Sequence, residues 1–267
     1  VRMRIDGQMV SYLTLEKALH NSIVARIKIM SNLNIAEKRI PQDGNFHAVL
    51  EGIDISMRIS VLPTTHGEKI VMRYLVSDTK IDHAGHFGMN EYSYNMLMKM
   101  MSAPNGIIYI TGPTGSGKTT TLYMVLQHLS QRPVNISTIE DPVEYVYESG
   151  MSVIHQREIG VDTKSFAASL RSALREDPDV ILVGEMRDYE TISAAVTAAE
   201  TGHLVMSTLH TTGAAQTLDR IIDSCPPHAQ NQIRTQLSTI LKGVITQALI
   251  PLAMGGGRVA ATEILVG

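Results

Sequence analysis

The first part of the chain, up to about Ser77, carries short runs in which apolar and polar residues alternate, as they do in half-buried β-strands. The alternation predicts a strand over 1–5 that ends in a turn at Asp6-Gly7, and further strands over 46–50, 53–61 and 69–75. Apolar residues at helical spacing predict a helix over 16–30. We therefore expect a small α+β domain with an antiparallel sheet over residues 1–77.

Residues 78–88 show little periodicity and are expected to form a linker to a second domain over 89–267. After a helix expected over 91–101, the pattern changes: solidly apolar strands alternate with helices. Strands are predicted over 107–111, 134–139, 180–184 and 203–208, and helices over 118–130, 166–176, 190–201, from 213 onward and over 228–249. This alternation is typical of an α/β domain whose parallel sheet is buried on both faces.

A glycine-rich segment joins the first of these apolar strands to the helix that follows it. It fits the pattern G-x-x-x-x-G-K-[ST] at every position, with Gly112, Pro113, Thr114, Gly115, Ser116, Gly117, Lys118 and Thr119. The glycines let successive N–H groups point inward at an anion, and the N-terminus of a helix favours phosphate. Lys118 offers a charge to the β- and γ-phosphates, and Thr119 offers a hydroxyl to Mg²⁺. The segment predicts a nucleotide site.

Carboxylates follow two other apolar strands, at the sheet edge where α/β proteins bind ligands. Glu185 ends the strand 180–184 and is expected to orient a water of the Mg²⁺ shell. Glu140 ends the strand 134–139 and is the first candidate for the base that activates an attacking water. Asp141 and Glu144 follow it and are expected to be supporting groups or members of the metal shell.

Histidines and arginines supply further candidates. His210 follows the strand 203–208, where a sensor of the γ-phosphate would lie, and His203 stands at the other end of that strand. Transfer of the γ-phosphoryl group benefits from a positive charge that arrives from outside the loop. Arg58 and Arg73, on adjacent predicted strands of the first domain, could supply it to a neighbouring subunit, so that hydrolysis would depend on oligomer formation.

Composition narrows the classes of function. Of the 267 residues, 44% are apolar and 18% charged, which is enough for a core, and the net charge of −3 excludes a nucleic-acid binder that works by bulk positive charge. The single cysteine excludes a disulfide framework and a cysteine-rich zinc site within this chain. No apolar run approaches the roughly 20 residues that cross a bilayer. Because the chain begins within a predicted strand, we expect it to be part of a longer protein.

Taken together, these motifs make the sequence resemble the ATPases of type II secretion and type IV pilus systems. The segments 112–120 (with Thr120), 138–145, 183–188 and 203–220 look like that family's Walker A, Asp box, Walker B and His box, in the family's order. In the first domain, 4–7, 25–31, 35–44 and 67–73 resemble the assembly branch. The four-cysteine zinc module of secretion and many assembly ATPases is missing, because 248–258 runs straight on.

The resemblance implies a ring-shaped homohexamer with a RecA-like ATPase domain and a smaller PAS-like N-terminal domain. It implies ATP and Mg²⁺ as ligands, and nucleotide-site arginines at Arg58, Arg73, Arg171 and Arg187. It also implies that ATP hydrolysis drives a platform protein of the bacterial inner membrane to add pilin subunits. The protein would then be cytoplasmic and associated with the membrane only peripherally, through its partners.

Three alternatives stay open. A retraction motor of the same family would use the same hydrolysis chemistry. A RecA-like nucleic-acid translocase is disfavoured by the charge of −3 and by the scarcity of aromatic residues for stacking on single strands. A nucleotide-binding scaffold without hydrolysis is disfavoured because Lys118, Thr119, Glu140 and Glu185 are present together.

Overall fold

Contacts between Cα atoms divide the chain into two units, Val1–Lys80 and Ile81–Gly267, and each unit is described by itself. The structure is a computed structural model that describes all residues except 6–7, 51–52, 76–87, 148 and 254–257. The expected linker 78–88 lies outside the described residues, apart from Gly88.

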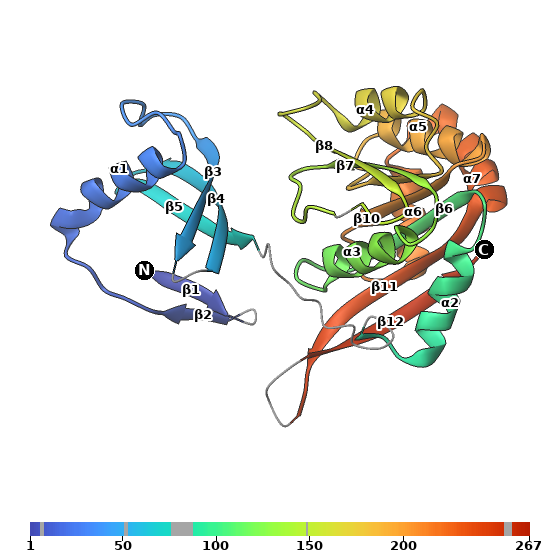
Figure 1. The fold of residues 1–267 in the computed structure, drawn as a ribbon, viewed down its shortest axis with the longest axis horizontal. Helices are drawn as coiled ribbons and strands as arrows, with labels where there is room; N and C mark the ends of the chain where they lie inside the picture. The colour runs from blue at the N-terminus through green and yellow to red at the C-terminus, as the bar shows by residue number, and fades with distance from the viewer. Residues whose placement is uncertain (6–7, 51–52, 76–87, 148, 254–257) are drawn as a thin grey trace. The chain divides into compact units, whose positions relative to one another are not determined.

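The N-terminal unit is a small α+β arrangement (Figure 1). Strands β1 (Arg2–Ile5) and β2 (Gln8–Ser11) pair antiparallel, and the turn expected at Asp6-Gly7 lies outside the described residues. A short 3₁₀ helix η1 (Lys17–Leu19) leads into α1 (His20–Met30). Strands β3 (Gln42–Leu50), β4 (Ile53–Thr64) and β5 (Gly67–Leu75) form an antiparallel sheet in that order. The α+β character expected for this domain is confirmed.

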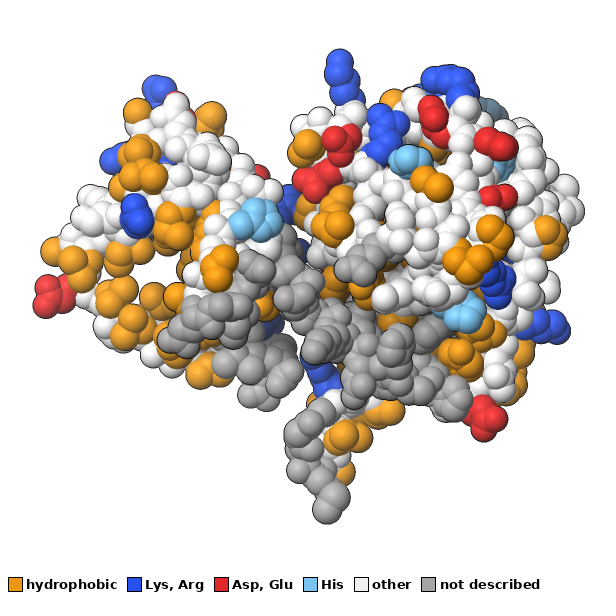
Figure 2. All heavy atoms as spheres, in the orientation of Figure 1, with side chains coloured by type: hydrophobic (Ala, Val, Ile, Leu, Met, Phe, Trp, Pro, Cys, Tyr) orange, Lys and Arg blue, Asp and Glu red, His pale blue; other side chains and the backbone are white. Residues whose placement is uncertain are grey.

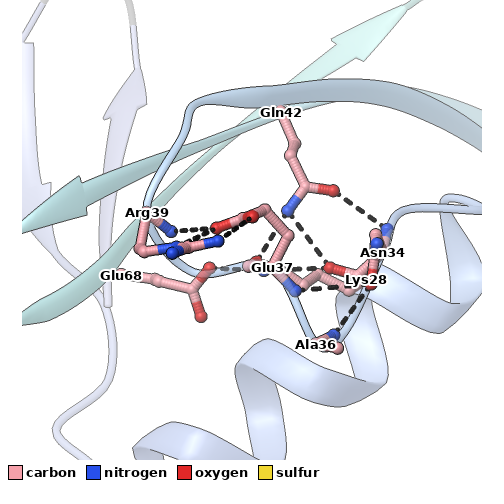
Figure 3. Close-up of polar contacts among 7 residues, drawn as sticks. All are labelled: Lys28, Asn34, Ala36, Glu37, Arg39, Gln42 and Glu68. Atoms are coloured by element: carbon pink, nitrogen blue, oxygen red, sulfur yellow. Dashed lines mark hydrogen bonds and ion pairs between the residues drawn. The ribbon is translucent and has the colours of Figure 1, made fainter.

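A buried lysine fixes the loop between α1 and β3 (Figure 3). Lys28 of α1 is fully buried, and its ammonium forms an ion pair with Glu68 of β5. The same group donates hydrogen bonds to the backbone oxygens of Asn34 (3.3 Å) and Glu37 (2.7 Å). The Gln42 amide reinforces the loop by donating to those two oxygens at 3.1 and 2.9 Å. An ammonium is tolerated in a core only when it is paired and hydrogen-bonded in this way.

The C-terminal unit contains a seven-stranded sheet in the order β12-β11-β6-β10-β9-β7-β8. Its strands are β6 (Gly106–Thr111), β7 (Asn135–Glu140), β8 (Val153–Glu158), β9 (Val180–Val183), β10 (Leu204–Leu209), β11 (Leu241–Pro251) and β12 (Arg258–Val266). All neighbouring pairs run parallel except β11 with β12. Strand β10 is inserted between β6 and β9, so the three carboxyl ends lie side by side.

Helices cover both faces of this sheet, as the apolar strands predict (Figure 1). On one face Ile107 and Tyr109 pack with residues of α4 (Phe166–Ala173), α5 (Tyr189–Glu200), α6 (Ala214–Asp223) and α7 (Pro227–Ile240). On the other face Ile108 and Ile110 pack with residues of α2 (Glu91–Met101) and α3 (Lys118–Leu129). The expected α/β class is confirmed.

The expected helix over 228–249 is wrong in its second half. Helix α7 ends at Ile240, and the chain continues as β11, which lies between β6 and β12. A short apolar run that is buried on both sides has the same pattern in a helix and in a central strand, so periodicity alone cannot separate them. Strands β8 and β12 escaped prediction because they are the two edges of the sheet and mix polar with apolar residues.

No helix in the described ranges is long and apolar enough to cross a membrane. Figure 2 shows Lys and Arg side chains scattered among Asp and Glu on the face that it draws. The N-terminal unit exposes large apolar side chains, among them Tyr12 (71% exposed) and Val49 (69%).

Replacing Lys28 by methionine should destabilise the N-terminal unit by about 3–5 kcal/mol, because the buried Glu68 carboxylate would lose its counter-ion. Adding Glu68→Leu to Lys28→Met should restore much of the loss, since an apolar pair needs no charge compensation. Hydrogen exchange of the α1 and β5 amides measures both. Arg39→Ala, at an exposed side chain, is the control, and equal exchange in Lys28→Met and wild type would contradict the expectation.

Candidate active site

The glycine-rich loop, residues 112–119, has the backbone that its sequence predicts. It leaves the end of β6 at Thr111 and enters α3 at Lys118. Gly112, Gly115 and Gly117 have φ values of 144°, 81° and 86°, which side chains rarely allow. Gly117 caps α3 without a side-chain hydrogen bond, so the first N–H groups of the helix are available to an anion.

Residues of strand β11 contact this loop and the end of β6 that leads into it. The amide of Gln247, which is only 2% exposed, donates to the backbone oxygen of Ser116 (2.7 Å) and accepts from the Thr121 hydroxyl (3.0 Å). Next to it the hydroxyl of Thr246 lies 2.8 Å from that of Thr111. A Cβ atom on Gly112 would lie 2.2 Å from the Gln247 carbonyl oxygen. The loop and β11 are therefore in direct backbone contact.

Polar groups inside the loop fit a phosphate. The buried ammonium of Lys118 donates to the backbone oxygens of Gly112 (2.7 Å) and Pro113 (3.0 Å). Burial lowers the pKa of this lysine, and the negative charges of Glu185 and Glu144 oppose that shift. The Ser116 hydroxyl is buried and has no hydrogen-bond partner in the described part of the chain. A bound phosphate would give both groups an anionic acceptor.

A chain of polar side-chain contacts continues from Lys118 to the ends of β10 and β9. The Lys118 Nζ atom lies 3.5 Å from Nδ1 of His210, and Nε2 of His210 lies 3.8 Å from Oε1 of Glu185. That oxygen is 2.6 Å from Nε of Arg187, and the contact raises the pKa of the arginine. The structure thus brings together Lys118, Glu185, Arg187 and His210, as the sequence predicted.

Glu140 has a different environment, although it ends a strand at the same edge of the sheet. Its carboxylate is 7% exposed and accepts from the Thr138 hydroxyl (2.6 Å) and from the Gln156 amide (3.1 Å). Burial raises the pKa of Glu140, while these two hydrogen bonds act in the opposite direction. A carboxylate with a raised pKa is a stronger base at neutral pH, as catalysis by proton removal requires.

Asp141 and Glu144 lie in the loop that follows Glu140. The charge of Asp141 contributes to the raised pKa of Arg187, and that of Glu144 acts on Lys118. Both acids are therefore close enough to influence the site electrostatically.

Thr119 and Thr120 are half-buried in the first turn of α3. Thr119 is the residue whose hydroxyl was expected to reach Mg²⁺. No three His, Cys, Asp or Glu side chains in the described ranges form a metal site of their own. Mg²⁺ in nucleotide sites is bound jointly by a few protein oxygens and by the phosphates, so Thr119 and Glu185 fit such a shared ion.

Two residues expected at the site, His203 and Arg171, make their contacts elsewhere in the described part of the chain and not with Lys118, Glu185 or His210. His203 precedes β10, where its ring Nδ1 lies 2.9 Å from the Ala198 backbone oxygen. Leu204 pairs with Gly106 at the start of β6, so His203 lies at the end of the sheet opposite to the loop. Arg171 of α4 is exposed and lies 3.8 Å from Glu190 of α5.

Arg58 and Arg73 belong to the N-terminal unit, where they are direct cross-strand neighbours on β4 and β5. Directly opposite residues point to the same face, and like charges so placed repel each other. Neither arginine has an ion pair with an acidic residue in the described ranges. The pair is thus suited to receive an anionic group.

A pocket of about 460 Å³ opens beside Glu185. It is lined by residues after β9, by the end of β10 with the residues that follow it, and by residues of α6 and its C-cap: Glu185, Met186, Arg187, Leu209, His210, Thr211, Arg220 and Ser224. The pocket includes Glu185, Arg187 and His210 and therefore belongs to the same site.

Sequence reasoning missed two glutamines, Gln156 and Gln247, that hold the site in shape. Gln247 could have been noticed as a lone amide within the apolar run 244–250, because a buried polar residue normally has a specific partner. Gln156 carried no such signal, since β8 itself was not predicted.

Comparisons with known proteins show the family to which this chain is similar. A family model described as type II/IV secretion system protein matches residues 1–261. The type II secretion system protein E of Xanthomonas campestris pv. campestris is 42% identical over 250 residues, which cover 94% of this chain and 42% of that protein. The chain thus spans less than half the length of this curated relative.

Two further relatives are pilus retraction proteins. The type IV pilus retraction ATPase PilT of Pseudomonas aeruginosa is 43% identical and is matched over 99% of this chain and 75% of its own length. A crystal structure of the pilus retraction motor PilT with bound ADP superposes with a TM-score of 0.74 at 37% identity, covering 99% of this chain and 76% of that one.

Gly112→Ala should abolish nucleotide binding, because the new Cβ would clash with the Gln247 carbonyl oxygen and φ is 144°. Gly115→Ala is the matched control: nothing lies within 4 Å of its Cβ, so the left-handed backbone alone should cost about 1–2 kcal/mol. Titration with a fluorescent ADP analogue compares the two. Equal affinities for the two variants would contradict the contact with β11.

Glu140→Gln should stabilise the protein at neutral pH. Because the folded-state pKa of Glu140 is raised above its ordinary value of 4.5, wild-type stability falls as pH rises through that raised pKa. The gain from the substitution should therefore be present at pH 7.5 and vanish near pH 4.5. Thermal unfolding at both pH values measures it, with Glu176→Gln at an exposed position as control. A gain independent of pH would argue against the raised pKa.

Proposed function

The chain belongs to the type II/IV secretion system protein family, and from this premise we propose that it is an ATP-hydrolysing motor. The motor would power assembly of a type IV pilus or pseudopilus, or type II secretion. The observation that carries the proposal is the contact of Lys118 in the glycine-rich loop with His210, and of His210 with Glu185, at the sheet edge where β7 also ends in Glu140.

The proposed reaction is attack of water on the γ-phosphorus of ATP, which breaks the bond to the bridging oxygen and yields ADP and phosphate. Lys118 balances charge on the β- and γ-phosphates, and Glu140 takes the proton from the attacking water. Mg²⁺, bound with the phosphates near Thr119 and Glu185, would supply further positive charge. His210, between Lys118 and Glu185, is suited to detect the γ-phosphate.

A positive charge from a neighbouring subunit would stabilise the negative charge on the γ-phosphoryl group during its transfer. Arg58 and Arg73 are proposed to reach the nucleotide of a neighbouring subunit in a homohexamer, and Arg171 and Arg187 to contribute at the same interface. The cross-strand arginine pair and the exposed apolar side chains of the N-terminal unit support assembly. Such an arrangement would couple hydrolysis in one subunit to the position of the next.

The proposed partner is a platform protein of the inner membrane, engaged at its cytoplasmic face. The mixed charges of the surface and the net charge of −3 give no support to a nucleic-acid track. The motor would then bind the membrane only through protein partners.

A retraction motor is the second candidate. The match with PilT, which reaches 75% of that protein's length against 42% for the secretion relative, favours it. Complementation of assembly-deficient and retraction-deficient strains separates the two directions of work.

Glu140→Gln should lower kcat for ATP by about 100-fold or more, because a general base contributes at least that factor. ADP binding should be unchanged, since in the described residues the side chains that hydrogen-bond to Glu140 are Thr138 and Gln156, which lie outside the loop. Phosphate release and nucleotide titration measure the two quantities. Turnover at the wild-type rate would remove Glu140 as the base, and turnover that needs DNA would favour the translocase.

Arg58→Ala or Arg73→Ala should reduce kcat by on the order of 1,000-fold if the arginine stabilises the transition state in trans, with nucleotide binding retained. Wild-type turnover per chain should rise with protein concentration as a six-fold species forms. Turnover assays combined with mass measurement in solution test both, with the exposed Arg26→Ala as control. A concentration-independent rate from a monomer would overturn the arrangement in trans.

A further inference from the structure

Gln156 of β8 makes hydrogen bonds at both ends of its side-chain amide. Its Nε2 donates to Oε1 of Glu140 at 3.1 Å and to the backbone oxygen of Tyr145 at 2.8 Å. Its Oε1 accepts from the backbone N–H of Tyr147 at 2.9 Å. The amide thus uses both donors and one acceptor, and it is fixed in orientation.

These contacts hold the Glu140 carboxylate in one position. Thr138, the residue directly opposite Gln156 in the parallel pairing of β7 with β8, donates to the same oxygen at 2.6 Å. The backbone N–H of Glu144 also lies against the carboxylate. In the described part of the chain no other side chain donates to Glu140, so its second oxygen, Oε2, has no competing side-chain donor. A carboxylate oxygen that no side chain donates to is the one suited to accept a proton from a water.

The same amide ties the carboxylate to the helix behind the glycine-rich loop. Tyr145 and Tyr147, whose backbone groups Gln156 binds, pack their rings on Tyr123 of α3, with centroids 4.9 and 5.2 Å apart. Glu158, two residues further along β8, accepts from the Val143 N–H at 3.0 Å and so fixes the start of the loop 143–147. Gln156 is therefore the shared point of β7, the loop 143–147 and, through the tyrosines, α3.

We propose that Gln156 is a positioning residue that orients the Glu140 carboxylate toward the attacking water. The proposal rests on the assignment of Glu140 as the base under the proposed function. Gln156 reaches neither the glycine-rich loop nor Lys118 by any hydrogen bond in the described residues. A change at Gln156 should therefore lower kcat and leave the nucleotide Kd unchanged. A residue that only stabilises the fold would change both quantities together.

The test is a double-mutant cycle in the full chain, read as kcat for ATP and as Kd for a fluorescent ADP analogue. Gln156→Met removes all three hydrogen bonds at similar volume and should lower kcat by about 10-fold to 100-fold with Kd unchanged, because loss of orientation costs rate rather than binding. In the Glu140→Gln background the same substitution should cause no further loss of kcat, since Gln156 acts through Glu140.

Gln156→Glu guards against a folding defect, because it keeps the shape and the acceptor for Tyr147. It removes both donations and places a like charge beside Glu140, so kcat should fall at least as far as in Gln156→Met. His155→Gln, at the exposed neighbouring position on β8, is the matched control and should leave kcat at the wild-type value.

Three outcomes would overturn the positioning role: wild-type kcat in both Gln156 variants, equal losses of kcat with and without Glu140, or weakened nucleotide binding that accounts for the loss. If Glu140→Gln alone retained turnover, the base assignment itself would be wrong and the role of Gln156 with it. The single and double variants therefore distinguish a failure of the proposed function from a failure of this inference.

Discussion

The backbone contact between Gly112 and strand β11 is the constraint on which the catalytic unit depends. Because a Cβ on Gly112 would lie 2.2 Å from the Gln247 carbonyl oxygen, the loop can follow its path only with glycine at this position. Gln247 then bridges the loop to Thr121, and Thr246 meets Thr111 at the end of β6. Lys118, at the start of α3, donates to the backbone oxygens of Gly112 and Pro113, so its position is tied to the same loop.

Two carboxylates at the same sheet edge have different environments. Glu185 is half-exposed, and its Oε1 lies 2.6 Å from Nε of Arg187. Glu140 is buried, and burial raises its pKa, so it holds a proton more readily. Pairs of acids whose surroundings differ in this way are a recurring feature of enzyme sites. Strand β8, at the edge of the sheet, contributes Gln156, which donates a hydrogen bond to the Glu140 carboxylate.

In the N-terminal unit, too, a buried polar side chain is held by specific partners. The Lys28 ammonium binds both Glu68 and the backbone of the loop 34–37. In this small unit, polar contacts of a buried charge thus join β5 and the loop to α1. The cross-strand pair of Arg58 and Arg73 is the reverse case, a concentration of positive charge on one sheet face. The contacts of Lys28 join the parts of the unit, and the Arg58–Arg73 pair suits one face of its sheet to bind an anion.

The sequence alone determined what depends on neighbouring residues: the glycine-rich loop with its strand and helix, the apolar strands of the parallel sheet, and the acids and histidine that follow them. These features rest on local backbone preference and short-range periodicity, which need no knowledge of distant contacts. Only the tertiary structure decided that 241–249 is a strand, that β8 and β12 are the sheet edges, and that His203 lies away from the loop. It also brought Gln156 to Glu140 and Gln247 to Ser116, residues 16 and 131 positions apart along the chain. Strand pairing and buried amide contacts join distant segments, so their energy is set by which surfaces meet in the fold and leaves no periodic signal in the sequence.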